Sequence, residues 1–137
     1  MLPTSRLLSP LTCTTANTNV RFITLLTRFN VVDNSTLGQR TRRYKKPYLI
    51  GFDRKCRTAD IGDVIRVAVR GKVQKALIVS TRKPKGPYIP RYDNNNIVLV
   101  DDNFAPIGTR IKCPLPTVLR AKKDKFAKVL ALATRFV

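Results

Sequence analysis

The clearest alternation of hydrophobic and polar positions lies in residues 62–83. Apolar residues occupy every second position of its first half, a period typical of a β-strand with one face in a core and a basic face outside. The apolar positions are Ile65, Val67 and Val69, and the alternating ones are Arg66, Ala68 and Arg70. Beyond a tight turn predicted at Gly71-Lys72, both faces of the second run are largely apolar. The stretch therefore predicts a β-hairpin within a closed or strongly curled sheet.

Shorter hydrophobic runs flank this hairpin and end in Asn, Asp and Gly residues that favour turns. The predicted strands are residues 27–35, 48–52 and 97–100, and residues 106–111 form a short extended segment. Residues 115–120 predict a short helical piece, whereas residues 124–132 fit both an amphipathic helix and a strand, because periodicity does not decide so short a run. The predicted fold class is mainly β.

Charge is the feature in which this chain departs most from an ordinary small domain. Its 137 residues include 27 Lys and Arg against 8 acidic residues, for a formal net charge of +19. Self-repulsion at that charge opposes compaction, so a densely negative partner is expected, and nucleic acid is a better candidate than an anionic membrane surface. No apolar run approaches the roughly 20 residues of a spanning helix, so membrane insertion is not expected.

The first 22 residues differ in composition from the rest of the chain. They contain Arg6 and Arg21, many Ser and Thr, and no acidic residue, since the first acid is Asp33. This is the profile of an organelle transit peptide. A secretory signal fits less well because Pro3 and Pro10 interrupt its apolar core, and a merely disordered tail is the alternative. We expect residues 1–22 to be a presequence and residues 23–137 one domain.

Two basic segments are candidates for contact with nucleic acid. Residues 38–46 carry five cations around Tyr44, and residues 82–92 combine four cations with two tyrosines and three prolines, without an acid. Tyrosine can stack on a base while Arg and Lys neutralise phosphates. The alternatives are a solvated loop for the first segment, and for the second an exposed loop whose tyrosines pack back on the sheet.

Catalytic constellations are nearly absent from the sequence. The chain has no His, and its three cysteines show no CxxC spacing. Asp93, Asp101 and Asp102 are carboxylates of the type that hold a metal in a nuclease, but they lie in turn sequences where Asp and Asn are expected for backbone reasons. We therefore predict no catalytic residue, no cofactor and no metal site, and no enzymatic activity.

Five blocks in a suitable order carry a family resemblance. They are TRFNVVDNS at 27–35, IGDVIRVAV at 61–69, KALIVSTRK at 75–83, PRYDNNNIVLVDDN at 90–103 and PIGTRI at 106–111. Together they resemble the universal ribosomal protein fourteen of the large subunit, in its mitochondrial branch. The resemblance implies a five-stranded β-barrel with short C-terminal helices and direct binding of large-subunit ribosomal RNA in the mitochondrial matrix. A free organellar RNA-binding module or RNA chaperone is the alternative function.

The residues and the resemblance together predict three sets of contacts. The ribosomal RNA contacts are Arg66, Arg70, Lys72, Lys75, Arg82, Lys83, Lys85, Tyr88 and Arg91. Additional RNA contacts are assigned to Arg40, Arg42, Arg43, Lys45 and Lys46, a basic insert with little counterpart in bacterial members. The resemblance further implies a place beside ribosomal protein nineteen, a bridge to small-subunit RNA, and docking of the ribosome silencing factor at Thr109, Arg110 and Lys128.

Overall fold

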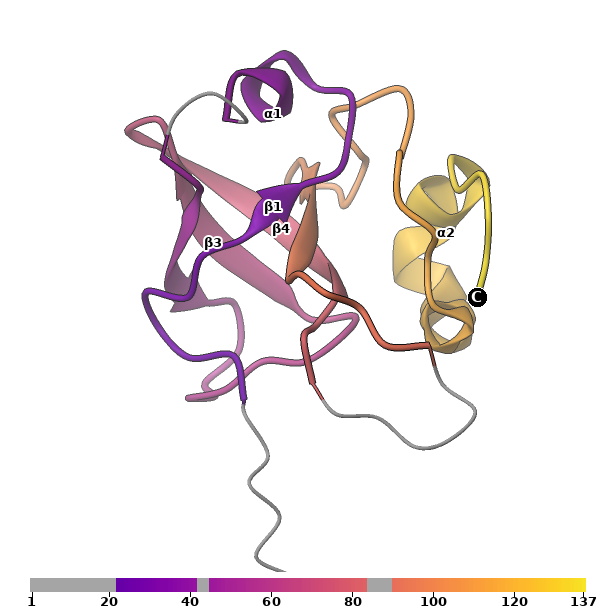
Figure 1. The fold of residues 1–137 in the computed structure, drawn as a ribbon, viewed down its shortest axis with the longest axis horizontal. Helices are drawn as coiled ribbons and strands as arrows, with labels where there is room; N and C mark the ends of the chain where they lie inside the picture. Colours follow the sequence, from indigo (N-terminus) through magenta and orange to yellow (C-terminus); the bar gives the residue numbers. More distant parts are fainter. Residues whose placement is uncertain (1–21, 42–44, 84–89) are drawn as a thin grey trace, which may run out of the picture.

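The fold is built around five strands and a C-terminal helical pair, which loops connect (Figure 1). The computed structural model describes residues 22–41, 45–83 and 90–137. The strands are β1 (Asn30–Val31), β2 (Tyr48–Phe52), β3 (Val64–Val69), β4 (Lys72–Ser80) and β5 (Asn96–Val100). The helices are α1 (Thr36–Thr41), the 3-10 helix η1 (Thr117–Lys122) and α2 (Lys123–Ala131).

The sheet is mixed, with the strand order β1-β5-β4-β3-β2. β1 runs parallel to β5, and the other neighbouring pairs are antiparallel. The predicted hairpin is confirmed as β3 and β4, but its turn is centred on Arg70 and Gly71, one position before the predicted pair. Both have positive φ, 53° and 81°, and this backbone matches the twist of a tight hairpin.

The side chains of β4 and β5 enter two separate hydrophobic clusters, one on each face of the sheet. Ala76 and Ile78 of β4 belong to the first cluster, whereas Leu77 and Val79 belong to the second. The prediction that both faces of this strand are covered is confirmed. Because the period of a strand is two, such double burial requires apolar residues at consecutive positions.

The first cluster receives side chains from all five strands, so the strands share one interior. The chain just before β1 also hydrogen-bonds to β2, which lies at the other end of the strand order. The N–H of Leu26 donates to the carbonyl of Leu49, and the N–H of Leu49 donates to the carbonyl of Thr27, both at 3.0 Å. These bonds bring the two ends of the sheet together along one stretch.

The predicted strand at residues 27–35 is shorter than expected and is followed by an unpredicted helix. Only Asn30 and Val31 form ladder pairs, with isolated bridges at Arg28 and Asp33. The hydroxyl of Ser35 accepts the N–H of Gly38 at 3.0 Å, the hydrogen bond of a helix N-cap. The alternative of a solvated loop at residues 38–46 does not hold for residues 38–41, which belong to α1, and contact of this segment with RNA stays a prediction.

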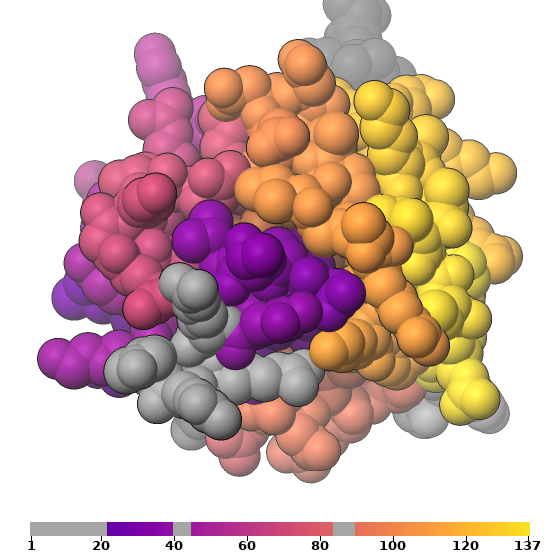
Figure 2. Space-filling model, turned by 90° about the horizontal axis from the view of Figure 1, so that it is seen from above, coloured from indigo at the N-terminus to yellow at the C-terminus, as the bar shows by residue number. Residues whose placement is uncertain are grey.

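From the α1 side, the violet segment lies between the pink hairpin and the orange segment that follows β5 (Figure 2). Two backbone hydrogen bonds of 2.9 Å hold it there, from Asn34 N–H to the carbonyl of Arg110 and from Lys112 N–H to the carbonyl of Val32. The predicted extended segment 106–111 thus serves as the partner of the chain around Asp33, through an isolated bridge to Ile111.

The second cluster lies between the sheet and the C-terminal helices, and it decides the ambiguous run at residues 124–132. Phe126 and Val129 are buried in it, as one face of α2. The ring of Phe126 also meets the ring of Phe104 edge-on, with centroids 5.9 Å apart. Helical spacing of these buried residues against an existing apolar face favours the helix over the strand. The helical piece predicted from residue 115 is confirmed as η1.

Candidate nucleic-acid interface

The basic run that leaves β4 splits into an exposed arginine and a buried lysine. The backbone N–H of Arg82 donates to the side-chain oxygen of Asn95 at 2.8 Å, while the Arg82 side chain stays exposed. The Lys83 ammonium donates to Asp60 Oδ2 at 2.7 Å and lies 4.8 Å from the centre of the Phe22 ring. Only 10% of the Lys83 side chain is exposed.

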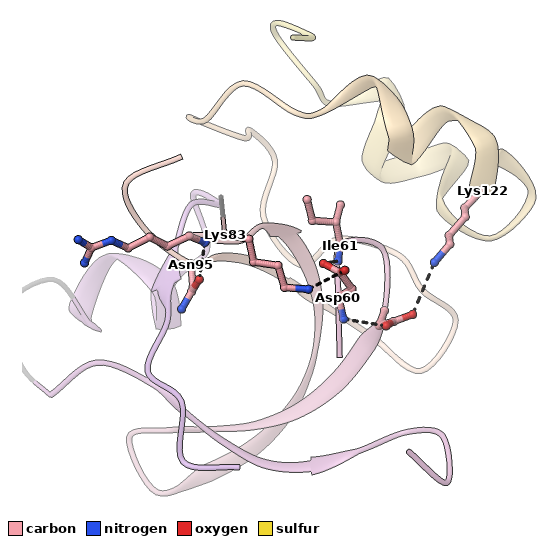
Figure 3. A network of polar contacts seen from close by, with 7 residues as sticks. Asp60, Ile61, Lys83, Asn95 and Lys122 are labelled. Atoms are coloured by element: carbon pink, nitrogen blue, oxygen red, sulfur yellow. Dashed lines mark hydrogen bonds and ion pairs between the residues drawn. The ribbon is translucent and has the colours of Figure 1, made fainter. Parts of the chain in front are cut away.

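Asp60 and Asp63 form a small network of hydrogen bonds and ion pairs with Lys83 and Lys122 (Figure 3). Asp63 accepts the backbone N–H of Asp60 at 2.9 Å and lies 3.5 Å from the Lys122 ammonium. Lys122 also donates to the carbonyl of Gly62. This network connects the loop before β3 with η1 and with the end of β4. The geometry therefore gives Lys83 a structural role, and the RNA contact predicted for it stays a prediction.

Arg66 and Lys75 lie opposite each other on β3 and β4, and each faces an aspartate. Arg66 Nη2 lies 3.9 Å from Asp53, and the Lys75 ammonium lies 2.8 Å from Asp102. Hydrogen bonding to Lys75, with its positive charge, lowers the pKa of Asp102. Exposed pairs of this kind contribute little to stability, but they offset the positive charge of this surface locally.

Tyr92, one of the two tyrosines of the predicted loop, packs inward. Its hydroxyl donates to the carbonyl of Pro114 at 3.3 Å, and the residue is 9% exposed. Burial raises the pKa of Tyr92, and the nearby Cys113 raises it further by a smaller amount. Tyr92 thus packs back on the protein, against the segment that precedes η1. Lys85 and Tyr88 lie outside the described residues, and Arg91 is exposed.

A basic groove that the sequence did not predict lies beside the hairpin turn. It has a volume of about 570 Å³ and is called the Tyr48 groove below. It is lined by Arg28, Lys45, Lys46, Tyr48, Ala68, Arg70 and Gly71. A smaller polar hollow of about 120 Å³, lined in part by Arg82 and Asn94, shares Arg28 and Lys46 with the groove.

The sheet register brings the walls of the Tyr48 groove together. Arg28 bridges to Tyr48, and Tyr48 pairs with Ala68 on β3, so residues 20 or more positions apart become neighbours. Tyr48 is 44% exposed although it begins a strand whose next residue is fully buried. The only local sequence signal for the groove is the lysine pair shortly before Tyr48. Nothing in the sequence around Arg28 indicates that this residue belongs to the groove.

The remaining predicted site residues lie on other parts of the surface. Lys72 is exposed next to the hairpin turn, and Thr109, Arg110 and Lys128 are also exposed. Ile111 and Val129, the neighbours of Arg110 and Lys128, are buried in the same second cluster. Arg40 falls at the end of α1, and Arg42 and Arg43 lie outside the described residues.

The structure shows no arrangement suited to the metal alternative in the part of the chain that it describes. Within residues 22–41, 45–83 and 90–137, no group of three or more His, Cys, Asp or Glu side chains is placed to hold a metal ion. None of the helices in these ranges is long and apolar enough to cross a membrane.

The described residues form a small mixed sheet with exposed cations on its turns and loops, and comparison with known proteins gives the class of the chain as a ribosomal protein. Residues 22–137 match the family model described as Ribosomal protein L14p/L23e. The chain belongs to this family. It is 45% identical over 118 residues to the large ribosomal subunit protein uL14m of Danio rerio, a match that covers 86% of this chain and 83% of that protein.

The family assignment confirms two predictions from the sequence. The resemblance to the universal ribosomal protein fourteen is confirmed, because the matching family and relative are of that kind. The prediction that the chain is not an enzyme is confirmed as well, since the family consists of structural ribosomal proteins.

Proposed function

We propose that this protein is a structural constituent of the mitochondrial large ribosomal subunit, where it binds large-subunit ribosomal RNA and supports mitochondrial translation. The observation that carries the proposal is the family match across residues 22–137, with 45% identity to uL14m. The charge supports it, because a net +19 fits a partner with dense phosphate charge.

The mechanism is electrostatic anchoring by a rigid scaffold. The hydrogen bonds between residues 26–29 and the start of β2 support a sheet that closes into a five-stranded barrel. Such a scaffold holds the exposed cations of Arg70, Lys72, Arg82 and Arg91 against phosphates with little loss of conformational entropy. Contact with phosphates releases counterions, and specificity comes from the shape of the folded RNA.

The compartment and the partners belong to the same proposal. The composition of residues 1–22 supports import into the mitochondrial matrix. The exposure of Thr109, Arg110 and Lys128 supports a docking surface for the ribosome silencing factor at the subunit interface, near ribosomal protein nineteen and a bridge to small-subunit RNA. Arg110→Glu and Lys128→Glu should weaken capture of that factor, and Lys55→Glu, at an exposed lysine outside the predicted contacts, serves as the control.

Sedimentation tests the proposed function directly. A C-terminally tagged chain from lysed mitochondria is run on a sucrose gradient at moderate salt, and the co-migrating RNA is sequenced. Co-migration with large-subunit RNA that is lost on magnesium chelation is the expected result. If the tag stays near the top of the gradient with mixed RNAs, a free RNA-binding module or RNA chaperone takes the place of the ribosomal constituent.

A further inference from the structure

We propose that the Tyr48 groove binds an unpaired nucleotide of RNA, with the base against the Tyr48 ring and the flanking phosphates at Arg28 and Lys46. This inference rests on the proposed function, which requires contact with ribosomal RNA. It adds Arg28 and Tyr48 to three residues already predicted to contact RNA, namely Lys45, Lys46 and Arg70.

The backbone places the ring of Tyr48 between cations from three separate segments. Arg28 bridges to Tyr48 from the chain before β1, and Lys46 precedes β2 by two residues. Arg70 reaches the groove from the hairpin turn, where its positive φ of 53° is part of the turn geometry. Ala68, opposite Tyr48 in the register, is a small residue and leaves the ring accessible from the groove.

The charge of the Tyr48 groove differs from that of the other hollow on the hairpin. No acidic side chain lines the described part of the Tyr48 groove, whereas four cations do. The other hollow contains Arg66 and Lys75 together with Asp101 and Asp102, and Lys75 pairs with Asp102. Of these two hollows, the Tyr48 groove therefore has the larger excess of positive charge among its described lining residues.

An exposed aromatic ring among cations favours single-stranded RNA over the other anionic partners. A duplex presents its phosphates but keeps its bases stacked inside, so Tyr48 would have no base to contact. An acidic peptide would need only the cations and would leave the Tyr48 ring without a contact. A base stacked on Tyr48, with its phosphates on Arg28 and Lys46, uses both features, as in other binders of single strands. The volume of about 570 Å³ lies within the range of about 300–1,000 Å³ that small ligands occupy.

Fluorescence titration of the full-length chain tests this assignment with a labelled oligouridine and an RNA duplex of equal length. We expect Tyr48→Leu to weaken binding of the oligouridine about tenfold and to leave duplex binding nearly unchanged, while Tyr48→Phe keeps the affinity of the unmodified chain. The double variant Arg28→Gln/Lys46→Gln should lower the salt dependence of oligouridine binding by about 1.4 in the log–log slope, because two phosphate contacts are lost. Lys112→Gln is the control, since that exposed lysine lies outside the groove and outside the predicted RNA contacts.

Three outcomes would overturn the assignment: unchanged oligouridine binding by Tyr48→Leu, an equal loss for the duplex, or displacement of the oligouridine by polyglutamate at matched charge. Thermal unfolding of each variant separates lost binding from lost folding, and the tolerated Tyr48→Phe variant provides a second check. Sedimentation of the unmodified chain with large-subunit RNA would uphold the proposed function even if the Tyr48 variants bound RNA normally, so the two proposals fail separately.

Discussion

The ammonium nitrogen of Lys83 lies 2.7 Å from Oδ2 of Asp60, so a lysine from the middle of a basic run is directed into the protein. Its neighbour Arg82 remains exposed. Adjacent cations in one segment thus have different environments, and substitution of each by glutamine distinguishes an effect on stability from an effect on RNA binding.

Lys83→Gln should lower the free energy of unfolding by about 1–2 kcal/mol, between the values for exposed and buried ion pairs, because it leaves Asp60 without its charged partner. Arg82→Gln should change stability by less than about 0.5 kcal/mol and should weaken binding to ribosomal RNA instead. Urea unfolding and RNA titration of both variants check the pair. Equal stability of the two variants would contradict a structural role for Lys83.

Gly108→Ala should destabilise the fold because the added methyl group has no room. A Cβ at this position would lie 2.9 Å from the backbone nitrogen of Asn34 and 2.9 Å from the Cβ of Asp33. Since backbone atoms cannot turn aside as a side chain can, we expect a loss of about 1–3 kcal/mol in thermal unfolding. Gly51→Ala is the matched control, because no atom lies within 4 Å of its Cβ position. A similar loss in both variants would show that packing around Gly108 is not the cause.

Asp33 should make stability fall as pH rises above about 4. Burial raises the pKa of Asp33 above its ordinary value of 3.8, although hydrogen bonding with Ser35 opposes the shift. Between 3.8 and the folded-state pKa, the folded protein holds a proton that the unfolded chain has released, so the free energy of unfolding decreases with pH across that window. Above the folded-state pKa the loss is complete and constant.

The variant Asp33→Asn removes this titration and should flatten that part of the pH dependence in urea unfolding. The lowered pKa of Asp102 contributes with the opposite sign, as stability lost when pH falls, but it is present in both proteins and cancels in their difference. A difference between the two proteins that stays constant from acid to neutral pH would rule out Asp33 as the titrating group.

Ile23→Ala should destabilise the domain, although Ile23 borders the predicted presequence. The residue is 4% exposed, belongs to the first core cluster, and its carbonyl accepts the N–H of Ala59 at 3.1 Å. Removal of a buried isoleucine side chain costs about 2–4 kcal/mol. Leu25→Ala is the control, since Leu25 is 54% exposed and should lose less than about 0.5 kcal/mol. If the prediction holds, any presequence cleavage that preserves the fold occurs before Ile23.

Local sequence was sufficient for the elements whose signals lie in consecutive residues. The bounds of β2 agree with the predicted strand at 48–52, and the alternation of Ile65 with Arg66 places the buried and exposed faces of β3 correctly. A period of two and a turn that requires positive φ are properties of a few neighbouring residues, so they can be read without knowledge of the fold.

The helix that begins at residue 36 could not be predicted from the local sequence, and neither could the choice between helix and strand for residues 124–132. α1 depends on a cap from Ser35 to Gly38 inside a segment whose charges dominate its composition. α2 depends on burial of Phe126 and Val129 against a cluster formed by β4 and β5. In both places a weak local preference is decided by contacts with other parts of the chain.

The sequence alone determined the basic, mainly β character of this protein, its ribosomal family and the positions of most of its cations. Only the tertiary structure decided which cations are exposed and which are paired inside. Lys83 is directed inward because Asp60 lies beside it, and Arg28 joins Tyr48 because the sheet register places them together. The physical reason is that charge is a property of each residue, whereas its compensation depends on which distant residue the fold brings within a few ångströms.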